Sequence, residues 1–531
     1  MRSVVGEDEN RRTPHDVVVI GAGFSGIGAG IRLRNAGIDD FVIIDSAGDL
    51  GGTWRDNRYP GVAVDVTSLN YCFSWEQNPR WSRLFAPGEE LLAYAHRCAD
   101  KYRLRPHMRF DHHVERMRFD GQSHEWTIDL TGRPPLRARF VILATGGLVQ
   151  PKSPDIAGID TFMGKVMHTA RWDHDHDLAG QRVAVIGTGA SAVQVVPSIA
   201  DEVEHLSVFQ RTPIWIVPKP DARIPASVQR AFESMPIAQK TLRAITAVLT
   251  QAVFLGSILY YRQLPGLARA FERICRAHLA RQVADPTLRD ALTPTYSFGC
   301  KRPSFSNDYW RAFNRSNVDL VTAPIETITP TGIRTVDGTE RDIDLLVLAT
   351  GFKVFELGNL PPFDVYGPDG TELGLFWDEH RYQAYEGTSV PQFPNLFHVI
   401  GPYAMTGSSY FSMIEAMTLH AARCITEARR RGATYVAVRQ EPHDAYFAEV
   451  QRRLRNSVFV NGDCTRSNSY YFDRHGDTPL LRPSTGWGLW WRHRRFDLDN
   501  YEYRTAEPVS ASATGSAHAT ARSPHGDDVH A

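Results

Sequence analysis

No pair of cysteines in this 531-residue chain has the C-x-x-C spacing, although the chain contains six of them, Cys72, Cys98, Cys275, Cys300, Cys424 and Cys464. This lack argues against a dithiol redox centre and a compact zinc site, and it favours a reducing, cytoplasmic setting. The N-terminus, Met1 to Arg12, is charged and lacks the apolar core of a secretory signal. A net charge of −1 gives no global electrostatic basis for binding nucleic acid.

One uncharged run, the 18 residues from Ala244 to Tyr261, approaches the length of a membrane span. Hydroxyl and amide side chains interrupt it, so we expect a buried or partly exposed helix, with a weak peripheral membrane contact as the alternative. The composition, with 42% hydrophobic and 22% charged residues, is typical of a globular chain. Its length predicts two or three domains.

A first glycine-rich loop, Gly21-Ala-Gly23-Phe-Ser-Gly26, follows a β-branched run and precedes a small-residue segment typical of a helix. The glycines allow a tight turn, a close approach of the backbone to a pyrophosphate, and packing of the helix on the strand. A second apolar strand then ends in Asp45, an acid placed to bind a ribose hydroxyl. The sequence therefore predicts a dinucleotide-binding unit.

A second loop, Gly187-Thr-Gly189-Ala-Ser-Ala192, repeats the design with an alanine that the pattern tolerates. Asp45 follows Gly21 by 24 residues, and the residue 24 positions after Gly187 is Arg211. An acid would repel the 2′-phosphate of NADP, whereas a guanidinium pairs with it. The second unit is therefore predicted to bind NADP, with Arg211 and Thr212 contacting the phosphate.

Three further patterns accompany these loops. The first has the form F-x-G-x-x-x-H-x-x-x-W-D and consists of Phe162, Gly164, His168, Trp172 and Asp173. The second runs from Gly51 to Asp65 as G-G-x-W-x4-Y-P-G-x3-D, and the third is the corner Lys301-Arg302-Pro303. With these patterns the chain resembles the type I Baeyer–Villiger monooxygenases, flavoproteins that insert one oxygen atom of O2 beside a ketone carbonyl.

The resemblance implies an α/β fold with two Rossmann-like dinucleotide-binding domains, the NADP domain being inserted into the FAD domain. The expected segments are a flexible arm (1–13), the first FAD segment (14–160), the NADP domain (161–340) with a helical insertion at about 222–292, the second FAD segment (341–503) and a disordered tail (504–531).

The resemblance also implies the cofactors FAD and NADPH, and the conversion of a ketone to an ester or lactone through a C4a-peroxyflavin. Arg302 is the expected catalytic cation, Asp65 is expected to hold it, and Lys301 is expected on the NADP phosphate. The expected cofactor-binding residues are Gly21, Gly23, Phe24, Ser25, Gly26, Asp45, Gly52, Thr53, Trp54, Asp65, Tyr71, Val114, Tyr410, Gly187, Thr188, Gly189, Ala190, Ser191, Arg211, Thr212 and Lys301.

Three other functions are compatible with two such nucleotide-binding folds. A flavin monooxygenase that oxidises nitrogen or sulfur does not need the Lys-Arg-Pro corner, although one enzyme can carry out both reactions. A non-catalytic, NADP-sensing flavoprotein does not explain adjacent Lys301 and Arg302. A disulfide reductase needs a redox-active cysteine pair, which the spacing does not provide.

Two conspicuous segments receive structural interpretations. We expect His168 and Trp172 to couple the two nucleotide domains without contacting the reacting atoms. The segment Asp173-His-Asp-His-Asp177 is rich in potential metal ligands. Alternating residues of one loop seldom converge on a single ion, so we predict a solvated turn and no metal.

Overall fold

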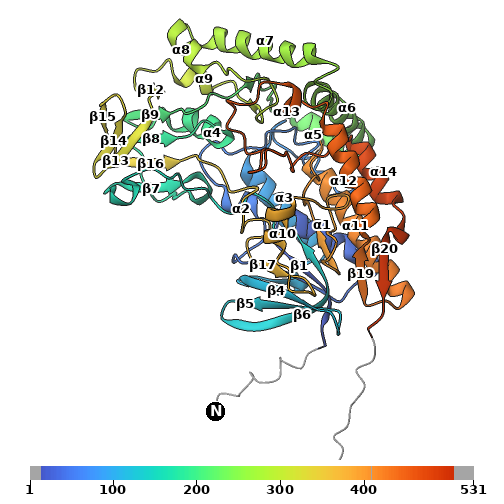
Figure 1. Cartoon of the computed structure of the whole chain (residues 1–531). Helices are drawn as coiled ribbons and strands as arrows, with labels where there is room; N and C mark the ends of the chain where they lie inside the picture. Colours follow the sequence, from blue (N-terminus) through green and yellow to red (C-terminus); the bar gives the residue numbers. More distant parts are fainter. Residues whose placement is uncertain (1–12, 408, 507–531) are drawn as a thin grey trace, which may run out of the picture.

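The computed structural model describes residues 13–407 and 409–506, and Figure 1 shows them as two sheet-centred bodies with helices above and beside them. The predicted arm and tail lie almost entirely in residues 1–12 and 507–531, outside the described residues. The α/β fold with two Rossmann-like domains is confirmed.

The first sheet is centred on β1 (His15–Ile20), whose residues 17–20 are buried by neighbours on both sides. It pairs in parallel with β2 (Phe41–Ile44) and β6 (Arg133–Leu143). Within the described residues the strand order is β17-β4-β5-β6-β1-β2-β3, and β18 also pairs with β6. The other strands are β3 (Met108–Arg109), β4 (Val114–Asp120), β5 (Glu125–Leu130), β17 (Asp364–Tyr366) and β18 (Leu396–His398).

Helices α1 (Phe24–Asn35), α3 (Gly88–Lys101) and α11 (Tyr410–Arg431) pack together on the first sheet. Because α11 lies far along the chain from α1, the domain is assembled from two separate segments. Its remaining elements are α2 (Thr53–Asp56), α10 (Leu373–His380), α12 (Gln440–Leu454), α13 (Val458–Asn461), α14 (Gly486–Arg495), β19 (Tyr435–Val438) and β20 (Tyr501–Arg504).

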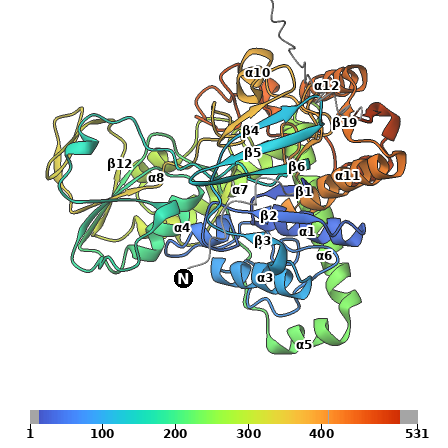
Figure 2. The same ribbon diagram turned by 90° about the horizontal axis from the view of Figure 1, so that it is seen from below.

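The second sheet is parallel, with the order β12-β9-β8-β16-β7, and Figure 2 shows it on the opposite side of the molecule from α11. Its elements are β7 (Lys165–His168), β8 (Arg182–Ile186), α4 (Ala190–Ile199), β9 (His205–Phe209), α9 (Tyr309–Ala312), β12 (Val318–Val321) and β16 (Leu345–Leu348). The predicted boundary at residue 340 is wrong, because β16 pairs with β7 and β8. The chain leaves this sheet only after residue 348.

The segment between β9 and β12 is mostly helical, and α7 and α8 lie along the top of Figure 1. It comprises α5 (Ala226–Ser234), α6 (Pro236–Phe254), the π-helical turn η5 (Leu255–Leu259), α7 (Pro265–Gln282) and α8 (Pro286–Leu292). Short strands complete the fold, namely β10 (Ile216–Val217), β11 (Ser304–Phe305), β13 (Ile325–Thr329), β14 (Gly332–Thr335) and β15 (Glu340–Asp342).

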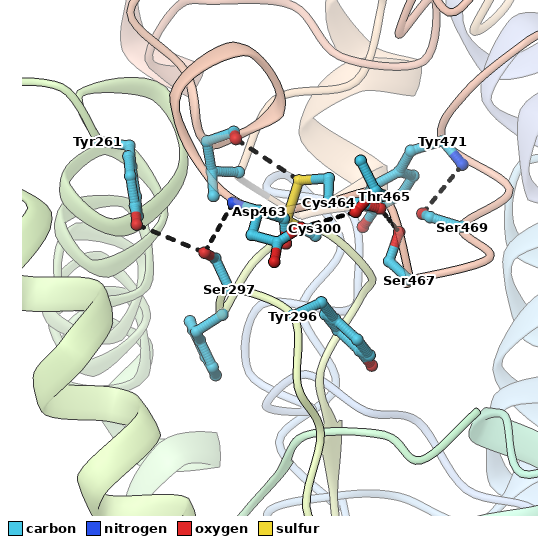
Figure 3. Close-up of a disulfide and its surroundings, with 12 residues drawn as sticks. Tyr261, Tyr296, Ser297, Cys300, Asp463, Cys464, Thr465, Ser467, Ser469 and Tyr471 are labelled. Carbon is cyan, nitrogen blue, oxygen red and sulfur yellow. Dashed lines mark hydrogen bonds between the residues drawn. A yellow bond between two sulfur atoms is a disulfide. The ribbon is translucent and has the colours of Figure 1, made fainter.

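A disulfide joins Cys300 to Cys464 across 164 residues of sequence (Figure 3). The local spacing of the cysteines gave no sign of this pair, because its partners come from two distant segments. Beside the disulfide, the Asp463 backbone N–H donates to Ser297 Oγ at 3.1 Å. The link ties the helical segment to the second FAD segment immediately before Lys301.

We predict that the double variant Cys300→Ser/Cys464→Ser loses about 2–4 kcal/mol of unfolding free energy, because the crosslink restricts a long loop in the unfolded chain. Thermal unfolding followed by circular dichroism should show the loss. Dithiothreitol should lower the Tm of the wild type and leave the variant unchanged. Equal effects of the reductant on both proteins would contradict the crosslink's contribution.

Candidate active site

A single cavity of about 1740 Å³ runs between the two sheets. Both glycine-rich loops line it, and so do Asp65, Arg302 and Tyr470. A pocket for one drug-sized ligand occupies roughly 300–1,000 Å³, so this cavity has space for more than one such molecule. Its position at the ends of parallel strands is where α/β sheets bind their ligands.

The first glycine loop enters the cavity from β1. Gly21 has φ +112°, and a Cβ at this position would lie 2.5 Å from the Ala144 carbonyl oxygen, so only glycine fits the turn. Asp45 accepts hydrogen bonds from the backbone N–H of Ala22 at 2.7 Å and of Ala47 at 2.9 Å. The carboxylate therefore shapes the loop as well as lining the cavity beside the site expected for a ribose.

Aromatic side chains line the cavity together with the first glycine loop. Trp54 Nε1 donates to the Tyr71 hydroxyl at 3.2 Å, and the two rings meet edge to face at 5.5 Å. Burial raises the pKa of Tyr71, and the neighbouring Tyr410 raises it further, so this phenol remains protonated. Tyr410 begins α11 and lines the same cavity. These three side chains give this part of the cavity an aromatic lining suited to contact with a planar ring.

The remaining predicted residues on the first unit also face the cavity. Val114 begins β4 and is buried. Gly26 alone lies behind the loop, where a Cβ would meet the Gly21 carbonyl oxygen at 1.8 Å. The cavity lining includes Gly21, Gly23, Phe24, Ser25, Asp45, Gly52, Thr53, Trp54, Asp65, Tyr71, Val114 and Tyr410.

Two cations, Arg211 and Lys301, line the cavity together with the second glycine loop. Lys301 is half-buried, and burial together with the charge of Arg211 lowers the pKa of Lys301 to about 8. Among the described residues, no carboxylate forms an ion pair with either side chain. Two unneutralised cations in one pocket favour an anion there, as a 2′-phosphate would be. Gly187, Thr188, Gly189, Ala190, Ser191, Arg211, Thr212 and Lys301 all line the cavity.

Next to Lys301, Arg302 has the opposite electrostatic environment. Its Nε donates to Asp65 Oδ2 at 2.9 Å and its Nη2 donates to Asp65 Oδ1 at 2.8 Å. This bidentate pair raises the pKa of Arg302, chiefly through the charge of Asp65, so the guanidinium stays a cation. A guanidinium has five N–H groups, so the pair leaves donors available to the cavity.

Several residues of the site have no signal in the sequence patterns. Gln194, on α4, accepts from the Tyr59 hydroxyl at 2.9 Å and donates to the Ala63 carbonyl at 2.9 Å, which joins the two domains. Asn468 donates to Thr212 Oγ1 at 2.7 Å. Both are polar residues whose partners lie more than 100 residues away, so only the folded chain brings them together.

The fingerprint lies at the connection between the domains. His168 ends β7, its Nδ1 accepts from the Ala170 N–H at 3.1 Å, and its ring meets Phe352 edge to face. Phe352 follows the strand that returns the chain to the first domain. A Cβ on Gly164 would lie 2.4 Å from the Asp344 carbonyl oxygen. Asp173, at the exposed end, binds Lys165 at 2.8 Å, and Trp172 packs on the core of the second domain.

Neither Cys300 nor Cys464 lines the cavity in the described part of the chain. The pair is held next to Lys301, but its sulfur atoms do not face the space between the nucleotide loops. The disulfide therefore does not supply the cavity-facing dithiol that a disulfide reductase needs.

Comparison with known proteins covers almost the whole chain. Residues 18–253 match a family described as pyridine nucleotide-disulphide oxidoreductase. The chain is 40% identical over 504 residues to a Baeyer-Villiger monooxygenase of Streptomyces coelicolor, covering 94% of each. It is 37% identical over 496 residues to one of Pseudomonas aeruginosa, covering 93% and 92%. The crystal structure of OTEMO in complex with FAD and NADP matches with a TM-score of 0.80 at 27% identity, covering 93% of this chain and all of that one.

We predict that the KM for NADPH rises as the pH increases through about 8, because Lys301 loses the positive charge that attracts the 2′-phosphate. Lys301→Met should raise this KM about tenfold to a hundredfold at pH 7 and flatten its pH dependence, since a charge-assisted hydrogen bond is lost. Steady-state kinetics between pH 6.5 and 9.5 measure both effects.

NADH, which has no 2′-phosphate, is the matched control for this pH dependence. Its KM should be insensitive to Lys301→Met. A similar rise in the KM for NADH would show that the substitution disturbs the whole pocket and would contradict a phosphate contact.

Proposed function

The chain belongs to the type I Baeyer–Villiger monooxygenases, flavoproteins that use FAD, NADPH and O2, and on that premise we propose that Arg302, held by Asp65, is its catalytic cation. The observation that carries this proposal is the bidentate pair between these two residues at the wall of the cavity, between the two nucleotide loops. The first glycine loop with its aromatic neighbours fits FAD, and the second glycine loop with Arg211 and Lys301 fits NADP.

Bound FAD, reduced by NADPH, supplies the activated oxygen that adds to the ketone carbonyl. The carbonyl oxygen of the ketone gains negative charge as this addition proceeds. Arg302 donates N–H groups toward that oxygen, and its raised pKa keeps it from acting as a proton source. Asp65 fixes the plane of the guanidinium, so the donors are oriented before the reaction begins.

Arg211, Thr212 and Lys301 bind the 2′-phosphate, and Asn468 positions Thr212 through its side-chain hydrogen bond. NADP held by these residues would close the cavity and exclude water from the reacting atoms. The second domain would then contribute to oxygenation as well as to reduction.

The substrate is a ketone, and we assign it apolar flanks. Met405, Met413, Phe472 and Leu480 line the cavity together with Tyr470. Thioether side chains are unbranched and adapt to irregular apolar shapes. A set of cyclic, aryl and linear ketones of increasing size, assayed by gas chromatography, would rank these shapes. Preference for ketones with charged flanks would contradict the assignment.

We place the enzyme in the cytoplasm, where NADPH is regenerated. The Cys300–Cys464 disulfide stands against this placement, since disulfides are rare in reducing compartments. Fractionation of the native host, with rapid alkylation of free thiols, reports both location and oxidation state. Recovery outside the cytoplasm would overturn the placement.

We predict that Arg302→Ala lowers ester formation at least about a hundredfold, because the reaction loses an oriented donor to the developing negative charge. NADPH should still be oxidised, with hydrogen peroxide replacing ester as the product. Arg302→Lys should recover only a small part of the activity, since an ammonium group cannot form the bidentate pair with Asp65. Parallel measurement of ester, NADPH and peroxide separates these outcomes.

Arg334→Ala is the matched control, because Arg334 also pairs with a carboxylate, Glu326, at 2.8 Å, but neither of these two exposed residues lines the cavity. It should retain the wild-type ratio of ester to peroxide. Undiminished ester formation in Arg302→Ala would remove Arg302 from the mechanism.

A further inference from the structure

Helix α6 has its polar face toward the protein, the reverse of an ordinary surface helix. The side chains that face inward make hydrogen bonds with the body of the protein along the length of the helix. These bonds are Gln239 to the Asn78 carbonyl (2.7 Å), Arg243 to the Cys72 carbonyl (2.8 Å), Asn70 to Thr246 (2.7 Å) and the Gly486 N–H to Gln251 (2.9 Å). The helix is therefore anchored by polar contacts.

The opposite face of α6 is aliphatic and open to solvent. The exposed fractions are 70% for Ile237, 52% for Ile245, 66% for Val248 and 62% for Leu249. Ile245 lies two helical repeats of four after Ile237, and Val248 and Leu249 follow Ile245 by three and four residues, so the four side chains share one side of the helix. Together α6 and η5, Pro236–Leu259, are long and apolar enough to cross a membrane, and only 22% of their most apolar stretch is buried. An exposed apolar stripe of this kind marks an interaction surface.

Helix α14 begins beside α6, where the Gly486 N–H donates to Gln251 at 2.9 Å. Trp487 and Trp491, one turn apart on α14, are 69% and 47% exposed. Tryptophan is enriched where proteins meet the interface of a lipid bilayer, because its ring is apolar and its N–H is polar. Figure 1 shows α14 and α6 at the same side of the molecule.

The charged side chains of the two segments that form this face have one sign. Between Glu233 and Glu272 the sequence contains no acid, but it contains exposed Lys240, Arg262 and Arg269. Helix α14 also has no acid and ends with the exposed pair Arg494-Arg495, whose guanidinium groups lie over Trp490 and Trp491. A second copy would bring these cations against each other, whereas anionic lipid headgroups would neutralise them.

We propose that α6 and α14 form a docking face that lies on a membrane surface containing anionic phospholipids. The helix lies on the bilayer and does not cross it, because the hydrogen bonds of its polar face hold it to the body of the protein. The apolar stripe enters the headgroup boundary, the tryptophans fix the depth, and the surrounding cations bind phosphate groups.

Vesicle flotation with the FAD-loaded protein tests this proposal. Vesicles of phosphatidylcholine alone are compared with vesicles containing 30% phosphatidylglycerol, at low and at high salt. We expect binding to the anionic vesicles that salt weakens. The variant Val248→Asp/Leu249→Asp should bind anionic vesicles at least roughly tenfold more weakly, because two apolar side chains that would be buried in the membrane are lost.

The variant Val336→Asp/Leu375→Asp is the matched control, since these two residues are 60% and 57% exposed elsewhere on the surface. It should bind like the wild type. Trp487→Phe tests α14 independently, because the blue shift of tryptophan fluorescence on adding anionic vesicles should decrease in it.

Three outcomes would overturn the proposal. One is a lack of vesicle binding, and another is equal binding to neutral and anionic vesicles. The third is a wild-type dimer, measured by light scattering, that Val248→Asp/Leu249→Asp converts to monomers in the absence of vesicle binding, because the face would then bind a second copy. Retained FAD absorbance in every variant shows that the substitutions leave the fold intact.

Discussion

The pairing of Asp65 with Arg302 is the interaction on which the arrangement of the site depends. The two residues lie 237 positions apart, one in the first FAD segment and one in the NADP domain after the helical insertion. Their bidentate contact therefore requires both domains to be placed correctly around one cavity. It also gives the guanidinium a fixed plane and a permanent charge, which are the properties that stabilisation of a developing oxyanion needs.

Lys301 and Arg302, although adjacent in the sequence, have contrasting charges around them. Arg302 is neutralised by a carboxylate, and its pKa is raised. Lys301 faces another cation, and its pKa falls to about 8. Arg302 therefore stays positively charged during the reaction. The charge of Lys301 is balanced only when an anion binds beside it.

The same corner is tied to the C-terminal part of the chain. The Cys300–Cys464 disulfide anchors the segment that brings Asn468 to Thr212 and Tyr470 to the cavity. A second contact between the domains is made by Gln194, which forms hydrogen bonds with Tyr59 and Ala63. The cavity is consequently enclosed by three segments that are distant in sequence. Helix α6 belongs to the same insertion, and its outward apolar face gives the enzyme a surface that its catalytic parts do not explain.

The sequence by itself determined the two nucleotide units, because strand, glycine turn, helix and acid are local patterns set by backbone geometry and hydrophobic spacing. It also determined the family, through motifs such as Trp172-Asp173 and Lys301-Arg302-Pro303, and it predicted the helical insertion. Only the tertiary structure decided which distant residues meet. The tertiary structure pairs Cys300 with Cys464, places β16 in the second sheet, and orients α6 with its apolar face outward. These outcomes depend on packing between distant segments, and the order of residues within a single segment does not determine them.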